Sequence, residues 1–153
     1  MAVIVQKYGG TSVGSIEKIK NVAAKVAKCY RDGNSVAVVV SAMSGQTDKL
    51  INLAKELSPK PDPREMDVLV STGEQVSIAL LAMALRDMGI PARSVLGFQI
   101  PIITDKAFMK ARIEDIKSNT LKEIFAAAKI LELICYLQSL IRYGRPQIWE
   151  LKS

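Results

Sequence analysis

Hydrophobic residues fall along this chain in blocks with two different periodicities. Residues 2–5 and 36–40 are short, nearly continuous apolar runs, a pattern typical of strands buried on both faces of a parallel sheet. Between them, apolar residues recur every three or four positions from Ile16 to Tyr30. This spacing predicts a helix with Ser15 as its N-cap. A strand, a helix and a second strand in this order are typical of an α/β fold.

The rest of the chain continues the alternation of helices and strands. The later predicted elements are a helix marked by Leu50, Leu53, Ala54 and Leu57, a helix over residues 64–88 with Gly73 as a candidate break, strands over residues 94–96 and 100–104, and a helix over residues 113–128. The order β-α-β-α-α-β-β-α predicts an α/β fold of the layered αβα sandwich type, with a mostly parallel sheet.

Composition narrows the classes of function. Apolar residues make up 49% of the chain and aromatic residues only 5%, so the core must consist mainly of aliphatic side chains. The formal net charge is +6, but lysines and arginines alternate with acidic residues, so no nucleic acid partner is expected. The chain contains no histidine, which excludes Ser-His-Asp catalysis, Cys-His catalysis and zinc sites with imidazole ligands.

The sequence also predicts the compartment. Cys29 and Cys135 lie far apart in apolar stretches with helical spacing, which favours buried free thiols in a reducing environment. No basic segment precedes the first apolar run, as a signal peptide would require. The longest apolar stretches are too short or too interrupted to span a bilayer. We therefore expect a cytoplasmic protein with no membrane partner.

The first candidate site is a Gly-Gly turn between a strand and a helix. Lys7 and Tyr8 precede Gly9 and Gly10 in the run Lys-Tyr-Gly-Gly-Thr-Ser. Glycines let backbone amides approach a ligand closely, and the following helix offers its positive dipole end. With the Lys7 charge, these features predict a phosphate-binding corner. The alternative is an ordinary turn, since the run matches neither a Walker A loop nor a dinucleotide-binding fingerprint.

Two further polar segments follow apolar elements. Residues 41–48 come directly after the second predicted strand, where ligands bind in open α/β sheets, so Ser41 could lie beside the Gly-Gly turn. Glu74 precedes a very apolar stretch and could bind a substrate amine. The alternatives are that Thr47 or Asp48 caps the next helix and that Glu74 complements a helix dipole.

Taken together, these segments resemble the aspartokinases of the amino-acid kinase family. The matching runs are Lys7-Tyr8-Gly9-Gly10-Thr11-Ser12, Val39-Val40-Ser41-Ala42-Met43, Ser71-Thr72-Gly73-Glu74, Gly97-Phe98-Gln99 and Ile103-Thr104-Asp105. The resemblance covers about residues 2–127, and the order and spacing of the runs make the set specific.

The resemblance implies phosphoryl transfer from ATP to the side-chain carboxylate of L-aspartate, with Mg²⁺, in the biosynthesis of lysine, threonine and methionine. Lys7 would be catalytic, because it neutralises charge on the transferring phosphoryl group. By resemblance, the ATP-binding residues would be Lys7, Tyr8, Gly9, Gly10 and Ser41, and the aspartate-binding residues would be Thr47 and Glu74.

The end of the chain departs from this family. Residues 1–127 are expected to be the N-terminal part of the kinase domain. Residues 128–153 read as a divergent helical tail, in which Ile130, Ile134, Leu137 and Ile141 keep a helical period. The family's R-G-G-S-D segment and C-terminal regulatory domains are absent, so we expect an incomplete sandwich. Expected partners are a homo-oligomer or a full-length kinase subunit. The alternative function is a non-catalytic remnant or interaction subunit.

Overall fold

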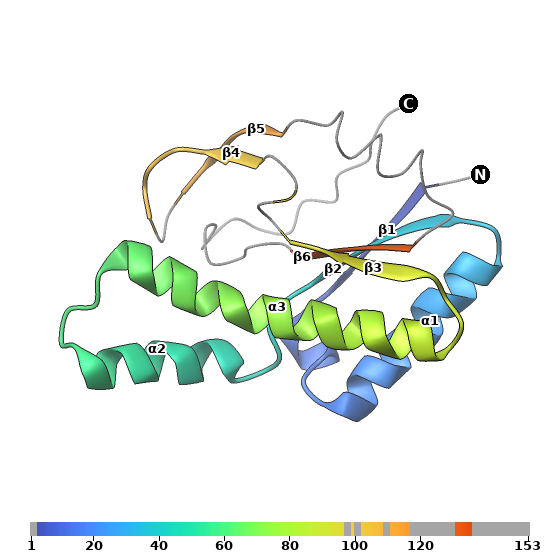
Figure 1. The fold of residues 1–153 in the computed structure, drawn as a ribbon, viewed down its shortest axis with the longest axis horizontal. Coiled ribbons are helices and arrows are strands. Elements are labelled where there is room, and N and C mark those ends of the chain that lie inside the picture. Colours follow the sequence, from blue (N-terminus) through green and yellow to red (C-terminus); the bar gives the residue numbers. More distant parts are fainter. Residues whose placement is uncertain (1–2, 97–98, 100–101, 109–110, 117–130, 136–153) are drawn as a thin grey trace.

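A four-stranded parallel sheet forms the centre of the fold (Figure 1). The computed structural model describes residues 3–96, 99, 102–108, 111–116 and 131–135. The strands are, in spatial order, β1 (Val3–Tyr8), β2 (Ser35–Val40), β6 (Leu131–Cys135) and β3 (Ala92–Val95). All three pairings are parallel. The predicted α/β class and parallel sheet are therefore confirmed.

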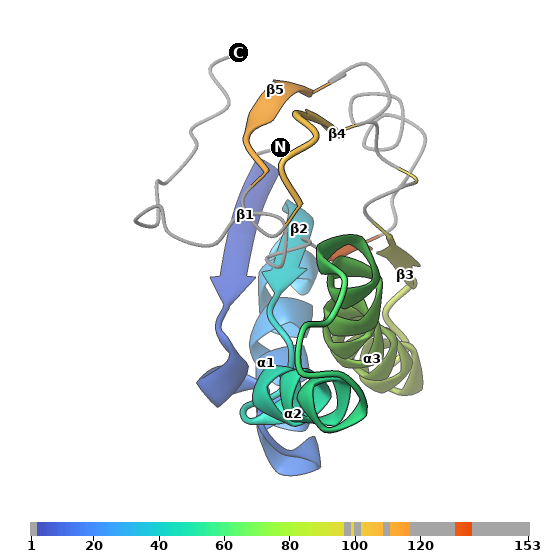
Figure 2. The same cartoon turned by 90° about the vertical axis from the view of Figure 1, so that its left-hand side faces the viewer.

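Helices lie on one side of this sheet and a β-hairpin on the other (Figures 1 and 2). The helices are α1 (Ile16–Arg31), α2 (Gln46–Leu57) and α3 (Pro63–Asp87). α1 and α3 pack against the sheet, and α2 packs on α3. The hairpin pairs β4 (Ile102–Thr104) with β5 (Ile113–Ile116) in antiparallel fashion.

Local sequence signals fix the starts of the two long helices. The Ser15 hydroxyl accepts a hydrogen bond from the Lys18 amide over 3.2 Å, which confirms Ser15 as the N-cap of α1. The Asp62 carboxylate accepts one from the Arg64 amide over 2.9 Å at the start of α3. Pro63 occupies the first turn of α3, where its missing amide hydrogen costs nothing. These caps satisfy amides that have no partner within the helix.

The core lies between β2 and the helices. Val36, Val38 and Val40 are buried on the helix side of the sheet. They share a cluster with Val22, Ala23 and Val26 of α1 and Ile78, Leu81 and Leu85 of α3. Successive side chains of a strand point to opposite faces. On β1, Val3 and Val5 face away from the helices and are each 51% exposed. The second face of the sheet is therefore only partly covered by the described residues.

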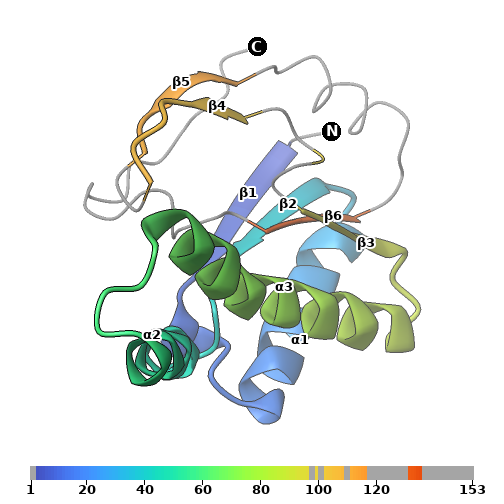
Figure 3. The same cartoon turned by 60° about the vertical axis from the view of Figure 1, so that its left-hand side comes forward.

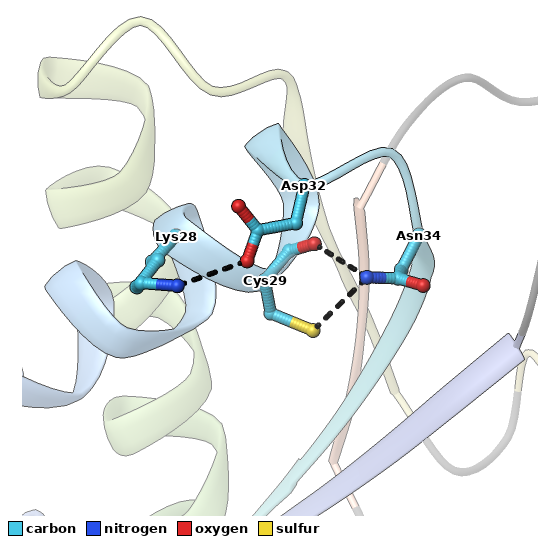
Figure 4. A network of polar contacts seen from close by, with 4 residues as sticks. All are labelled: Lys28, Cys29, Asp32 and Asn34. Atoms are coloured by element: carbon cyan, nitrogen blue, oxygen red, sulfur yellow. Dashed lines mark hydrogen bonds and ion pairs between the residues drawn. The ribbon is translucent and has the colours of Figure 1, made fainter.

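The turn between α1 and β2 is closed by polar contacts (Figure 4). The side-chain amide nitrogen of Asn34 donates to the Cys29 carbonyl over 3.1 Å and lies 3.9 Å from the Cys29 sulfur. Lys28 pairs with Asp32 over 3.0 Å at the surface, where such a pair adds about 0.5 kcal/mol. Cys29 is a half-buried free thiol. Gly33 has a φ of 88°, which a side chain would strain.

α3 differs from its predicted form in two respects. It runs without a break through Gly73, because close packing there outweighs the low helix propensity of glycine. It is also long and apolar enough, by length and composition, to cross a membrane, although the sequence had indicated no such stretch. Its inner face is buried against the sheet, as expected for the core helix of a globular domain.

Two predicted helices are wrong in the part of the chain that the structure describes. Residues 113–116 form β5, not the start of a helix over residues 113–128. Residues 131–135 form β6, although helical spacing had been read across residues 130–141. Short apolar runs cannot distinguish strand from helix by periodicity alone, and here strand pairing decided. Residues 117–130 and 136–153 of these predicted helices lie outside the described residues.

Candidate active site

Two of the candidate segments begin at the same edge of the sheet. The register of β1 and β2 pairs Lys7 with Val39 and Tyr8 with Val40, so both strands end together. The Ser41 amide then donates to the Tyr8 carbonyl over 3.0 Å. We call the carboxyl ends of β1 and β2, with the loops that follow them, the rim. The start of α2 also lies beside the rim (Figure 3).

The segment after β1 forms a short 3-10 turn, η1 (Gly10–Ser12). The buried Val13 follows it and anchors the turn in the core. Lys18 reaches back from α1 and donates from Nζ to the Thr11 carbonyl over 2.9 Å. The turn is therefore held by a side chain from the next helix, and that side chain brings a positive charge to the rim.

Gly10 lies directly against the loop after β2. The Cβ of any larger residue at this position would come within 2.6 Å of the Ala42 carbonyl oxygen, closer than real Cβ atoms approach. The Ser44 amide donates to the Gly10 carbonyl over 3.2 Å. A Cβ at Gly9, in contrast, would meet no protein atom within 4 Å. Packing within the chain thus requires a glycine at position 10 and leaves the space at Gly9 open.

The third segment meets the same loop from the opposite side. A Cβ at Gly73 would lie 3.0 Å from the Ala42 side chain and 3.6 Å from that of Leu50. Glu74, the next residue on α3, is 3% exposed. Backbone hydrogen bonds from Ala42 and from Glu74 itself reach its carboxylate. Ala42 therefore connects the Gly-Gly turn to Glu74, which the sequence could not place.

Glu74 is held in an environment that disfavours its charge. Burial raises the pKa of Glu74 from 4.5 to about 7, and the backbone hydrogen bonds lower it only in part. Among the described residues, its Oε2 atom accepts no hydrogen bond. A buried carboxylate in this state is suited to a cationic ligand, which would supply both the missing charge and a donor.

The other predicted site residues are spread around the rim. Lys7 is exposed at the end of β1, and Ser41 is half-buried at the start of the loop after β2. Thr47 is the second residue of α2, two positions after the N-cap Gly45, which has a φ of 79°. The N-cap of α2 is Gly45, with no side-chain cap hydrogen bond, so the alternative that Thr47 or Asp48 caps this helix is wrong.

Lys7 and Glu74 approach the rim from different layers. Lys7 lies two residues after Val5 on β1, so its side chain is on the same face as Val3 and Val5. This face is turned away from the helices. Glu74 comes from α3 on the helix side. The two residues are therefore brought to one edge of the sheet without direct contact. Lys7 and Glu74 thus approach the carboxyl ends of the strands from opposite faces of the sheet. Open α/β sheets bind their ligands at the carboxyl ends of the strands.

Comparison with known proteins now identifies the family. Residues 2–136 match the amino acid kinase family. The chain belongs to that family. This match extends across β6, so the strand read from sequence as a helical tail is part of the amino acid kinase region.

The relatives are aspartate kinases. An aspartate kinase of Stutzerimonas stutzeri is 55% identical over 131 residues, which cover 86% of this chain and 32% of that relative. The crystal structure of aspartate kinase from Synechocystis has a TM-score of 0.71 at 44% identity, covering 87% of this chain and 21% of that one. E. coli aspartokinase III in complex with aspartate and ADP has a TM-score of 0.70 at 22% identity, covering 88% and 40%, and supports the fold alone. The resemblance to aspartokinases is confirmed, and this chain spans about a third of the length of its curated relatives.

The sequence analysis missed some residues of this chain that shape the rim. Lys18 could have been suspected, because it lies one turn after the N-cap of the helix that follows the Gly-Gly turn. Gly14 is a second close contact, since its Cβ would lie 3.2 Å from both the Gly10 carbonyl oxygen and the Ser44 side chain. The contact between Gly73 and Ala42 had no signal in the sequence, because it depends on how α3 packs.

Proposed function

We propose that this chain forms the phosphate-donor and amino-acid subsites of an aspartate kinase. The reaction transfers a phosphoryl group from ATP to the side-chain carboxylate of L-aspartate and yields aspartyl phosphate and ADP. The observation that carries the proposal is the contact of Gly10 and Gly73 with the same residue, Ala42, which gathers the three candidate segments at one rim. The names of the relatives and the aspartate and ADP bound to E. coli aspartokinase III support the choice of substrates.

The phosphate subsite centres on the Gly-Gly turn. Gly9 leaves open space beside the strand ends, Gly10 holds the turn against the next loop, and Lys7 supplies a positive charge. Tyr8 and Ser41 lie at the ends of β1 and β2 beside this space, and a backbone hydrogen bond joins them. Two anions must approach each other in this reaction, so charge neutralisation and positioning provide most of the catalysis.

Mg²⁺ enters the proposal as the companion of the triphosphate. Among the described residues, no group of three or more His, Cys, Asp or Glu side chains could hold a metal ion. Mg²⁺ is commonly bound through substrate phosphates with few protein ligands, which fits this rim. Bound there, it would neutralise phosphate charge, while Lys7 and the backbone amides orient the phosphates.

The aspartate subsite uses Glu74 and Thr47. The Glu74 carboxylate would pair with the α-ammonium group of aspartate, whose charge would lower the Glu74 pKa and favour the ionised form. Thr47 would position aspartate from the first turn of α2. The attacking carboxylate of aspartate needs no general base, because it is already ionised at neutral pH. We place the reaction in the cytoplasm, where ATP and aspartate are available.

Calorimetric titration of the 153-residue chain with Mg·ADP and with L-aspartate tests the two subsites separately. We expect both ligands to bind. We expect Glu74→Gln to weaken aspartate binding at least about tenfold while leaving nucleotide binding unchanged, because it removes one partner of a buried charge pair. Glu65→Gln, at an exposed position on the same helix, is the matched control.

Trapping aspartyl phosphate with hydroxylamine measures turnover in the same samples. Equal aspartate affinities for the wild-type chain and Glu74→Gln would contradict the assignment of Glu74. An absence of binding by both ligands would contradict the proposal for this chain.

A further inference from the structure

Lys18 links the first turn of α1 to the Gly-Gly turn. Its backbone amide donates to the Ser15 hydroxyl over 3.2 Å, at the N-cap of the helix. Its ammonium nitrogen Nζ reaches back along the chain and donates to the Thr11 carbonyl over 2.9 Å. The neighbouring Ile19 is 2% exposed and anchors this part of α1 in the core. A cation on a firmly placed helix is therefore attached to the turn that we assign to phosphate binding.

The Thr11 carbonyl is the start of a chain of two hydrogen-bonded peptide groups. The first peptide group joins Thr11 to Ser12, and its carbonyl accepts the hydrogen bond from Lys18. The Ser12 amide of the same group donates to the Gly9 carbonyl over 2.9 Å. The second peptide group joins Gly9 to Gly10, so the chain ends at the Gly10 amide. In a trans peptide the N–H and C=O bonds point in opposite directions, so this amide points away from Ser12.

A positive charge at one end of such a chain strengthens the donor at its other end. Hydrogen-bonded groups polarise one another, by roughly 10–30% per bond. The Lys18 ammonium therefore polarises both peptide groups and makes the Gly10 amide a stronger donor. Among the described residues, the Gly10 amide hydrogen makes no hydrogen bond. Its peptide group begins at Gly9, where the space is open, so a phosphate oxygen there would be its acceptor.

We propose that Lys18 is a positioning residue of the phosphate subsite, which acts on the nucleotide phosphates through the Gly10 amide and not by direct contact. The inference rests on the proposed function, because it needs a phosphate at the Gly-Gly turn. Lys18 is exposed, and a surface lysine bonded to a carbonyl adds only slightly to folding stability. Its loss should therefore leave the chain folded and change phosphate binding.

Calorimetric titration of the full chain with Mg·ADP tests the effect on binding. We expect Lys18→Met to weaken Mg·ADP binding about three- to tenfold and to leave L-aspartate binding unchanged, because only the phosphate donor is affected. Lys18→Arg keeps the charge and a donor, so its affinity should stay within about twofold of wild type. Lys20→Met is the matched control, since it removes an equal charge from an exposed position on the same helix. Circular dichroism establishes that each variant is folded.

Proton–nitrogen correlation spectra of the ¹⁵N-labelled chain without nucleotide test the route through the peptide groups. Lys18→Met should move the Gly10 amide proton upfield, because a less polarised N–H is a weaker donor. Lys18→Arg and Lys20→Met should leave this resonance close to its wild-type position. A local brace without polarisation would not produce this pattern.

The two measurements separate the possible failures. Equal Mg·ADP affinities of wild-type chain and Lys18→Met would overturn the role of Lys18 and leave the proposed function intact, because the wild-type chain still binds. Weaker binding by Lys18→Met with an unmoved Gly10 resonance would also overturn the proposal and assign Lys18 to direct contact with phosphate. A wild-type chain that binds no Mg·ADP would overturn both this inference and the proposed function.

Discussion

Replacing Glu74 by glutamine should change the pH dependence of folding stability in a defined way. In the unfolded chain this carboxyl group loses its proton near its ordinary pKa of 4.5, whereas in the folded chain burial holds the proton until about pH 7. Between these values the unfolded state binds fewer protons than the folded state. The folded chain is therefore favoured at low pH, and this contribution is lost as pH rises through 7.

The size of the effect follows from the same pKa shift. Each pKa unit corresponds to about 1.36 kcal/mol. Raising the pH from 5 to 8 should therefore lower the free energy of unfolding of wild-type chain by about 2.5 kcal/mol through Glu74 alone. Glu74→Gln keeps the shape of the side chain but cannot ionise, so this decrease should disappear. The variant should be close to wild-type stability at pH 5 and clearly more stable at pH 8.

Urea denaturation followed by circular dichroism at pH 5 and pH 8 measures both free energies. Glu65→Gln serves as the control, because Glu65 is exposed on the same helix and should show the same small difference at both pH values. A stability difference between wild-type chain and Glu74→Gln that does not change with pH would refute the reasoning. In that case the Glu74 carboxylate would be ionised in the folded chain and stabilised by a group other than a ligand.

Further predictions concern the rim and its ligands. Gly10→Ala should destabilise the chain by about 1–3 kcal/mol in thermal melts, because its Cβ meets the Ala42 carbonyl oxygen, whereas Gly9→Ala should leave stability unchanged. Gly9→Ala should nevertheless weaken Mg·ADP binding in calorimetry, and an unchanged affinity would remove Gly9 from the phosphate subsite. Lys7→Met should weaken nucleotide binding at least about tenfold without altering the melting temperature, since Lys7 is exposed. Aspartate affinity should fall about tenfold per pH unit below pH 7 in wild-type chain and stay flat in Glu74→Gln, and parallel profiles would contradict the ammonium pairing.

The sequence predicted those parts of the fold that depend on local patterns. The valine run of residues 36–40 has too many consecutive apolar positions for a surface strand, and it forms the buried β2. Ser15 carries its own signal as an N-cap and occupies that position. The sheet edge shared by Lys7 and Ser41 followed from the rule that parallel strands end on one side, and the register of β1 and β2 places them there.

The remainder depends on contacts between distant residues, which periodicity does not encode. The helical spacing of residues 130–141 predicted a helix, but residues 131–135 form a strand that pairs with both β2 and β3. Gly10 and Gly73 both meet Ala42 only because α3 packs against the loop that follows β2. The burial of Glu74, and hence its raised pKa, could not be predicted from the sequence, because a glutamate early in an apolar stretch is usually solvated.

The position of β6 has a consequence for the order of folding. β3 pairs with β6 and not with β2, so the strand formed by residues 92–95 has no neighbour in this sheet until residues 131–135 are in place. The first two strands and their connecting helix can assemble early from nearby residues, but the sheet closes only when the latest strand enters its middle. Such long-range closure slows folding and leaves edges open to other chains meanwhile. During synthesis on the ribosome, β1, β2 and β3 are therefore made before β6, the strand that joins β2 to β3 in this sheet.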